Sequence, residues 1–121
     1  MTIEEQLTNI YLTKETWHKT RMDYPTALKY HKTRYENGDI YVYTEDGKVL
    51  GYYERYFKYN VCFLYNVYVE NDYRKGKVFK ELYRHFFKTM PKDITHVMGE
   101  KQRLGGKIMK EVINRRKYGF D

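Results

Sequence analysis

One segment near the middle of the chain limits the fold more than any other, residues 61–70, with the sequence VCFLYNVYVE. Apolar and aromatic side chains occupy both its odd and its even positions: Val61, Phe63, Tyr65, Val67 and Val69 in one set, Cys62, Leu64, Asn66 and Tyr68 in the other. Successive side chains of a strand point to opposite faces of its sheet. The segment therefore predicts a central strand that is covered on both sides.

The residues before this strand predict two helices. Residues 2–15 have Thr2 as a capping residue and acidic side chains in the first turn. A second helix is expected to begin near Asp23, with Pro25 in its first turn, and to end near Gly38.

The spacing of apolar residues then changes from the helical period to that of strands. Residues 40–43 and 49–57 predict two strands, joined by a hairpin turn at Asp46 and Gly47. A further turn at residues 58–60 leads into the central strand.

After the central strand, residues 71–74 predict a loop, and an amphipathic helix follows from Lys75 to about Pro91. Its apolar stripe is expected to contain Val78, Phe79, Leu82, Tyr83, Phe86 and Phe87. Residues 94–98 predict a short strand parallel to the central one, because a helix joins the two. We expect Gly99 to break that strand and residues 104–116 to form a last helix.

This order of elements predicts the α+β class, with a mixed, mostly antiparallel central sheet flanked by helices. The chain has 121 residues, so residues 1–121 predict a single domain. It lacks an apolar run as long as a membrane span, and its first residues are unlike a signal peptide, so we expect a cytoplasmic protein. The single cysteine, Cys62, is expected to be a buried and inert thiol.

The net charge of +7 favours anionic partners, either nucleic acid or a phosphorylated ligand, although solvated lysines on helix surfaces would give the same charge. The 15 tyrosines suit half-buried sheet faces or a ligand, and exposed ones are compatible with a homodimer. The most specific basic feature is the turn after the central strand, where Arg74, Lys75, Lys77 and Lys80 surround Gly76. Backbone N–H groups at the start of a helix and the helix dipole make such a turn an anion site.

Three motifs in order resemble the GNAT superfamily, the acyl-CoA N-acyltransferase fold. The segment from Val67 to the helix is similar to the family's strand, YRxxGxG/A turn and amphipathic helix. Residues 43–52, YTEDGKVLGY, resemble the hairpin of the family, and residues 116–120, RKYGF, are similar to its closing YxKxGF. The resemblance covers residues 39–120. The compact, Tyr- and Lys-rich chain also resembles products of phages or mobile elements.

This resemblance implies that the central strand splays from the next strand at a bulge and that acetyl-CoA lies in the resulting V. It implies that the backbone of the strand end binds the pantetheine and the thioester carbonyl, and that the backbone of the turn binds the pyrophosphate. An acceptor amine, on a protein or a small molecule, would then attack the thioester directly. The positions that correspond are Val67, Tyr68 and Val69 in the strand, and Arg74, Lys75, Gly76, Lys77, Val78, Phe79 and Lys80 in the turn and helix.

The sequence departs from the family pattern at several positions. Family glycines correspond to Lys77 and Phe79, and the C-terminal tyrosine that acts as an acid in the family corresponds to Arg115. An alternative is therefore a catalytically degenerate binding protein for nucleic acid or a protein partner. A cluster of basic residues supplies a candidate nucleic-acid surface: Lys101, Arg103, Lys107, Lys110, Arg115, Arg116 and Lys117.

The catalytic residues are not identified by motif. Tyr65 on the central strand and Glu100 beyond the next strand are candidates to face the thioester, against the alternatives of a packed tyrosine and a solvated glutamate. The four histidines, at positions 18, 31, 85 and 96, have no spacing typical of a metal site, and we expect no metal.

Overall fold

The computed structural model describes residues 1–14, 21–70, 76–101 and 107–112, with side chains as far as Gly99. These residues form three helices and a five-stranded sheet with the strand order β1-β2-β3-β4-β5. Only β3 and β4 run parallel, and the other neighbours are antiparallel. In chain order the elements are α1 (Ile3–Thr13), α2 (Tyr24–Glu36), β1 (Ile40–Glu45), β2 (Lys48–Lys58), β3 (Val61–Val69), α3 (Lys77–Lys88), β4 (His96–Lys101) and β5 (Lys107–Val112). The predicted α+β class and the mixed, mostly antiparallel sheet are confirmed.

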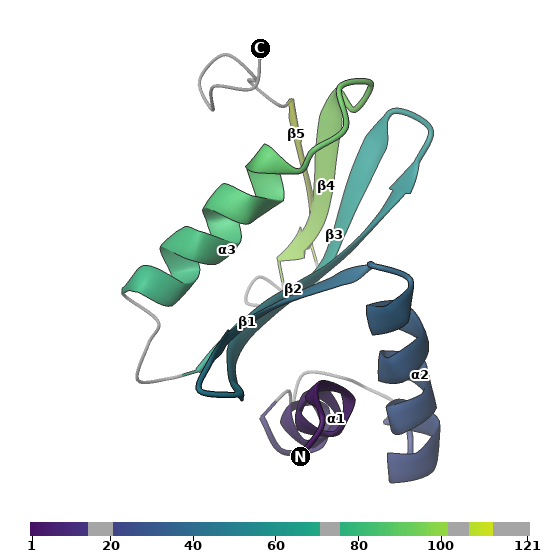
Figure 1. The fold of residues 1–121 in the computed structure, drawn as a ribbon. Helices are drawn as coiled ribbons and strands as arrows, with labels where there is room; N and C mark the ends of the chain where they lie inside the picture. Colours follow the sequence, from purple (N-terminus) through teal and green to yellow (C-terminus); the bar gives the residue numbers. More distant parts are fainter. Residues whose placement is uncertain (15–20, 71–75, 102–106, 113–121) are drawn as a thin grey trace.

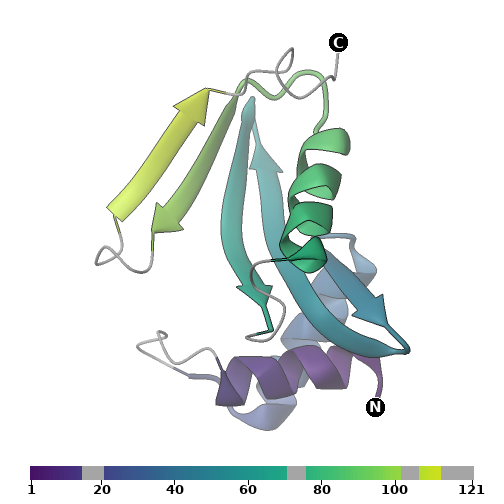
Figure 2. The ribbon, with the colours of Figure 1, turned by 90° about the vertical axis from the view of Figure 1, so that its left-hand side faces the viewer.

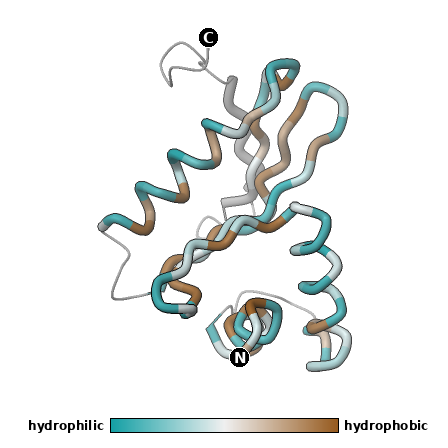
Figure 3. The backbone as a smooth tube through the Cα atoms, viewed as in Figure 1, coloured by the Kyte–Doolittle hydropathy of each residue, from teal (hydrophilic) through white to brown (hydrophobic). Residues whose placement is uncertain are grey.

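The helices form two layers on opposite faces of the sheet. Figure 1 shows α3 on one face, and α1 and α2 on the other. Each layer has its own core. The α3 core contains Leu50, Tyr53, Cys62, Val69, Val78, Leu82, Phe86, Met90 and Ile94, and the α1 core contains Leu7, Ile40, Val49, Tyr52 and Tyr68. Figure 3 shows hydrophobic stretches in the strands between the layers.

The ends of the elements follow the local signals in the sequence. Thr2 and Glu5 form a capping box at the start of α1, and Asp23 caps α2 by accepting a hydrogen bond from the Thr26 N–H. Asp46 and Gly47 both have positive φ, 51° and 77°, as a tight hairpin turn requires. The predicted cap at Thr2, the start of the second helix near Asp23 and the hairpin turn are confirmed.

The central position of β3 is confirmed, but its predicted alternation of faces is wrong beyond Leu64. Asn66 lies opposite Glu54 and Leu64 lies opposite Arg55, so β3 carries one extra residue, Tyr65, at a bulge. After a bulge, every later side chain of the strand points to the face opposite to the one that strict alternation predicts. Cys62 and Val69, which strict alternation places on opposite faces, consequently share the α3 core.

A second bulge lies in β2, next to the glycine at which the sheet closely approaches α3. Tyr43 lies opposite Gly51 and Thr44 lies opposite Val49, so Leu50 is the extra residue of β2. A Cβ atom built on Gly51 would lie 2.8 Å from a methyl carbon of Val78 and 3.0 Å from the backbone oxygen of Tyr68. The missing side chain of Gly51 therefore lets the first turn of α3 pack on the end of β3.

Two predictions for the last elements are wrong. Gly99 lies within β4, where it pairs with Leu64 on one side and Met109 on the other, and does not end the strand. Residues 107–112 form β5 rather than part of a helix from 104 to 116. Pairing with β5 satisfies backbone groups along the outer edge of β4, which a helix would leave without that partner. The remainder of the predicted helix lies outside the described residues.

The apolar stripe of α3 is narrower than predicted. Val78, Leu82 and Phe86 are buried against the sheet, whereas Phe79 and Tyr83 are 50% and 43% exposed.

Among the described helices, none is long and apolar enough to cross a membrane.

The close approach at Gly51 gives the first prediction. Gly51→Ala should lower the free energy of unfolding by about 1–3 kcal/mol, because the backbone oxygen of Tyr68 cannot move away from an added Cβ as a flexible side chain could. Gly99→Ala is the matched control, since the nearest atom to its Cβ would be 3.7 Å away. Urea unfolding of both variants measures the difference, and equal midpoints would contradict this packing.

Candidate active site

The candidate site begins where β3 and β4 separate. Their pairing extends from Val61 opposite His96 to Leu64 opposite Gly99. Beyond that point β3 continues to Val69 beside β2, while β4 continues to Lys101 beside β5. Figure 2 shows the two strands diverging into a V.

The bulge at Tyr65 lies next to the last β3–β4 pair, Leu64 and Gly99. An extra residue bends its strand and increases the local twist, and thereby re-aims the residues that follow. The divergence thus has a cause inside β3 itself. Side-chain alternation gives no signal for the bulge, because Tyr65 fits the predicted pattern as well as its neighbours do, but the resemblance to the GNAT superfamily implied a bulge where the central strand leaves the next one.

The three strand residues expected to meet the pantetheine have different environments. Tyr68 and Val69 are buried in the α1 and α3 cores, respectively. The side chain of Val67 is 45% exposed, although it lies in the central strand between two buried layers. Apolar surface is therefore accessible on the part of β3 beyond the bulge.

The second part of the site is the N-terminus of α3. Gly76 is its N-cap and makes no side-chain capping hydrogen bond. The first N–H groups of a helix have no intrahelical partner, and the helix dipole adds positive potential there. Val78 in this first turn packs against Gly51 and near the Tyr68 backbone, so the helix start lies at the end of β3.

The basic side chains of this turn are only partly described. Arg74 and Lys75 lie outside the described residues, and Lys80 is exposed. The Nζ of Lys77 lies 3.5 Å from the Glu45 Oε1, on the β1–β2 hairpin. The hydrogen bond to Tyr43 and the nearby Glu45 carboxylate raise the pKa of Lys77, so it remains a cation at neutral pH.

The opposite side of the bulge carries a pocket that the sequence did not predict. Tyr30 and Arg34 of α2, Tyr56 of β2 and Tyr65 of β3 line an open volume of about 220 Å³. Tyr65, the candidate acid, is 49% exposed.

Behind this pocket lies a buried carboxylate, Glu54, which is only 3% exposed. Its Oε2 accepts hydrogen bonds from the Tyr30 hydroxyl at 2.5 Å and from the Arg34 Nε at 2.8 Å. Burial and the bond to Glu54 raise the pKa of Tyr30, which therefore stays protonated and is not a base. Glu54 also lies opposite Asn66 in the ladder, beside the bulge, so it connects α2 to the bulge.

The sequence did contain a signal for Glu54. It is a lone carboxylate next to the apolar run of β2, and Tyr30 and Arg34 are spaced to share one face of a helix. The residues were missed because an acidic side chain in a strand is more often solvated.

The other candidates take no described part in the site. Glu100 lies in β4 opposite Ile108, and its side chain is outside the described part. Residues 102–106 and 113–121, which hold much of the basic cluster and the closing RKYGF, are also outside it.

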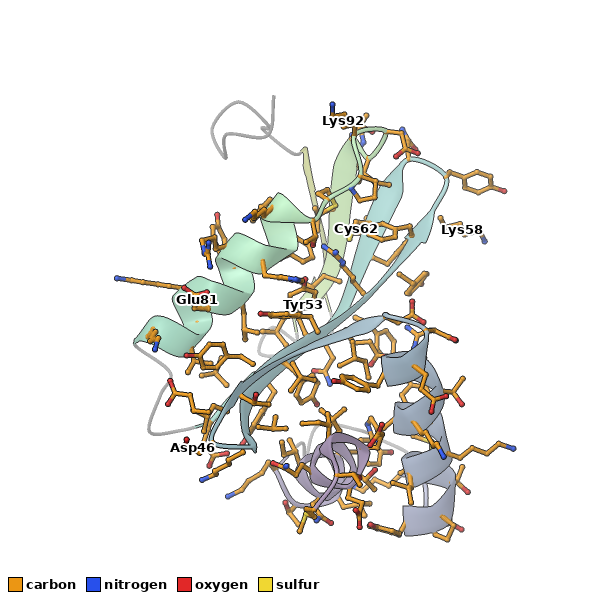
Figure 4. All side chains as sticks on the ribbon, in the orientation of Figure 1. Asp46, Tyr53, Lys58, Cys62, Glu81 and Lys92 are labelled. Carbon is orange, nitrogen blue, oxygen red and sulfur yellow. The ribbon has the colours of Figure 1, made fainter. Side chains whose placement is uncertain are left out.

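Cys62 is fully buried between α3 and the sheet (Figure 4), and burial raises the pKa of its thiol to about 11. The prediction of a buried Cys62 is confirmed, and the high pKa makes its thiol a poor nucleophile near neutral pH.

Histidines do not form a metal site in the described structure. His31, His85 and His96 each have their Nδ1 within 3.1 Å of a hydroxyl group, from Thr8, Tyr53 and Thr95. No group of three or more His, Cys, Asp or Glu residues in the described ranges could hold a metal ion.

The position of Glu54 gives the second prediction. Glu54→Gln should lower the free energy of unfolding by about 2–3 kcal/mol, because it removes the charge that compensates the Arg34 guanidinium in a buried place. The control is Glu45→Gln, at the 44% exposed carboxylate that pairs with Lys77, where the change should be at the limit of measurement. Equal losses in urea unfolding would contradict a structural role for Glu54.

Comparison with solved structures shows the same fold in acetyltransferases. The diaminobutyrate acetyltransferase EctA of Paenibacillus lautus, solved with L-2,4-diaminobutyric acid and coenzyme A, has 10% identity and a TM-score of 0.62, with 84% of this chain and 67% of that chain covered. A GNAT-family acetyltransferase of Staphylococcus aureus Mu50 has 17% identity and a TM-score of 0.63, with 84% and 70% covered. The PaiA N-acetyltransferase of Thermoplasma acidophilum, solved with coenzyme A, has 21% identity and a TM-score of 0.53, with 84% and 76% covered.

The search of curated proteins finds no match for this sequence. The family profile described as the acetyltransferase (GNAT) family matches residues 5–114, which is most of the chain. The implied family and fold are therefore confirmed: the chain belongs to the acetyltransferase (GNAT) family.

Proposed function

We propose that this chain is a single-domain N-acetyltransferase that transfers the acetyl group of acetyl-CoA directly to a primary amine. The observation that carries the proposal is the divergence of β3 from β4 at Tyr65, with the N-terminus of α3 at the end of β3. A long, thin ligand with an anionic centre matches this combination of an open V and a helix start.

The described residues fit acetyl-CoA in two respects. Its pyrophosphate would be bound by the backbone N–H groups of Lys77, Val78 and Phe79, because anions are stabilised at a helix N-terminus. Lys77 and Lys80 add cationic side chains, and Arg74 and Lys75 are proposed to do the same. The pantetheine would run along the strand at Val67, Tyr68 and Val69, where the side chain of Val67 offers apolar contact.

The chemistry required of the site is modest. The acceptor nitrogen loses a proton and its lone pair attacks the thioester carbonyl carbon, so that a C–N bond forms. The C–S bond then breaks, and the sulfur leaves with its electron pair and takes up a proton. Donors that stabilise the developing oxyanion accelerate this step. Tyr65, beside the bulge and half exposed, is the proposed proton donor to the leaving sulfur.

The comparisons support a CoA-dependent acetyltransferase of this general type. Two of the similar structures contain coenzyme A, and the substrate of one, L-2,4-diaminobutyric acid, is a primary amine. They give no support to the alternative of a catalytically degenerate binding protein.

Titration of the protein with acetyl-CoA by calorimetry tests the proposal. We expect micromolar binding, about tenfold weaker in Arg74→Ala and in Lys77→Glu, because each change removes a cation from the pyrophosphate site. Lys92→Glu makes the same charge change beyond the far end of α3 (Figure 4) and should leave the affinity within about twofold. Absence of binding by folded protein at millimolar acetyl-CoA would overturn the proposed function.

A further inference from the structure

Three aromatic side chains line one flank of α3. Phe79, Tyr83 and Phe87 recur at four-residue intervals, so they follow one another along the same side of the helix. The ring centroids are 6.3 Å apart for Phe79 and Tyr83 and 4.8 Å apart for Tyr83 and Phe87. These three residues, named the aromatic ridge below, therefore form one continuous apolar strip.

The ridge is anchored at one end and accessible at the other. Phe87 packs against the α3 core and meets Phe86 edge to face, with an interplanar angle of 88°. Phe79, in the first turn, is 50% exposed and lies nearly parallel to Tyr83, at an interplanar angle of 25°. The ring of Phe79 is therefore supported from behind while much of its surface stays in contact with water.

The ridge lies on the flank of α3 that faces away from β1. On the other flank His85 stacks on Tyr41 of β1, with ring centroids 3.4 Å apart. The helical period of 3.6 residues places the ridge across the buried stripe of Val78, Leu82 and Phe86 from this contact. Because β3 and β4 lie on the side of β2 away from β1, the ridge is on the side of α3 towards the V.

The open end of the ridge coincides with the proposed pyrophosphate site. The backbone N–H of Phe79 is one of the three proposed to bind the pyrophosphate, and the ring belongs to the same residue. In coenzyme A a ribose alone separates this pyrophosphate from the adenine, so the base must lie near the first turn of α3. Lys80, the next residue, is exposed and adds a cation for the phosphates. Aromatic rings beside cations are the combination that binds bases joined to phosphate.

The ring of Phe79 is a feature of this chain rather than of the fold. The GNAT pattern has a glycine at this position, which offers no side chain to a base. A phenylalanine ring has no hydrogen-bonding group, so half-exposure leaves apolar surface in water without a polar contact in return. Contiguous apolar surface of this kind is typical of a binding site.

We propose that Phe79 binds the adenine ring of coenzyme A by stacking, and that Tyr83 is a positioning residue that supports the Phe79 ring from behind. The inference rests on the proposed acetyltransferase function and assigns a residue to the part of the coenzyme beyond the pyrophosphate. Stacking requires only the π-face of the base, so no hydrogen-bonding side chain is needed beside Phe79. Binding of the coenzyme would then cover the exposed face of the ring.

Etheno-coenzyme A, whose modified adenine is fluorescent and is quenched by stacking, tests this contact directly. We expect quenching on binding to the wild-type chain and to Phe79→Tyr, which keeps a ring at this position. Phe79→Leu keeps an apolar side chain without a ring and should leave the bound base unquenched. Tyr59→Ala is the control, because Tyr59 is 86% exposed at the β2–β3 turn, and it should quench as the wild type does.

Calorimetry with acetyl-CoA measures the same contact as affinity. The Kd should rise about tenfold in Phe79→Leu and stay within about twofold in Phe79→Tyr and in Tyr59→Ala. Tyr83→Leu should raise it by a smaller factor, about threefold, because that ring acts through Phe79. Since Phe79 and Tyr83 are both exposed, the variants should keep the urea midpoint of the wild type, so a loss of affinity is not a loss of folding.

The outcomes separate this inference from the function on which it rests. If acetyl-CoA binds equally to the wild type and to Phe79→Leu, the adenine contact is wrong although the coenzyme site stands. Equal losses in Phe79→Tyr and Phe79→Leu would also overturn it, because the ring would then be irrelevant. If Phe79→Leu instead separates a dimer in sedimentation without a change in Kd, the ridge joins two copies and the contact is wrong. If the folded wild type binds no acetyl-CoA, the proposed function fails and this inference with it.

Discussion

The bulge at Tyr65 is the constraint on which the rest of the site depends. One extra residue in β3 ends the ladder with β4 after Leu64 and Gly99, and it shifts the parity of every later side chain in the strand. The shift sends Val69 to the α3 core and leaves Tyr65 beside α2. This one bulge thus separates the two strands and places side chains of β3 on both faces of the sheet beside the opening.

Two residues of β2 support this arrangement from opposite faces. Gly51 allows α3 to approach the end of β3, so the helix N-terminus lies where the V opens. Glu54 accepts hydrogen bonds from Tyr30 and Arg34 and thereby fixes α2 against the bulge. Both are local departures from an ordinary apolar strand, and each has a structural cost. A glycine weakens a strand, and a buried carboxylate must be compensated.

Much of the fold was predictable from the sequence, because its signals are local. The caps at Thr2 and Asp23, the turn at Asp46 and Gly47, and the apolar β3 each determine their structure within a few residues. The final strand was mispredicted, because apolar residues at 108, 109 and 112 suit a helix face as well as a strand. There the antiparallel pairing with β4, the strand that directly precedes it in the chain, decides the outcome.

The site was only partly predictable for the same reason. The basic turn and the residues of β3 are contiguous, so their pattern indicated an anion site at the start of α3. The pocket combines residues of α2, β2 and β3, and no sequence spacing joins Arg34 to Tyr65. The bulge that brings them together depends on the register between β2 and β3, which side-chain patterns do not reveal when both faces are apolar.

The most direct test of this account is an NMR titration of backbone amide signals with coenzyme A, which locates the ligand without relying on turnover. We predict the largest shifts at Val67, Tyr68 and Val69 beyond the bulge and at Lys77, Val78 and Phe79 in the first turn of α3. Amides at the β2–β3 turn, such as Tyr59 and Asn60, should not move. Shifts that cluster at another surface, or only at exposed lysines, would show that the divergence of β3 and β4 is not the coenzyme site.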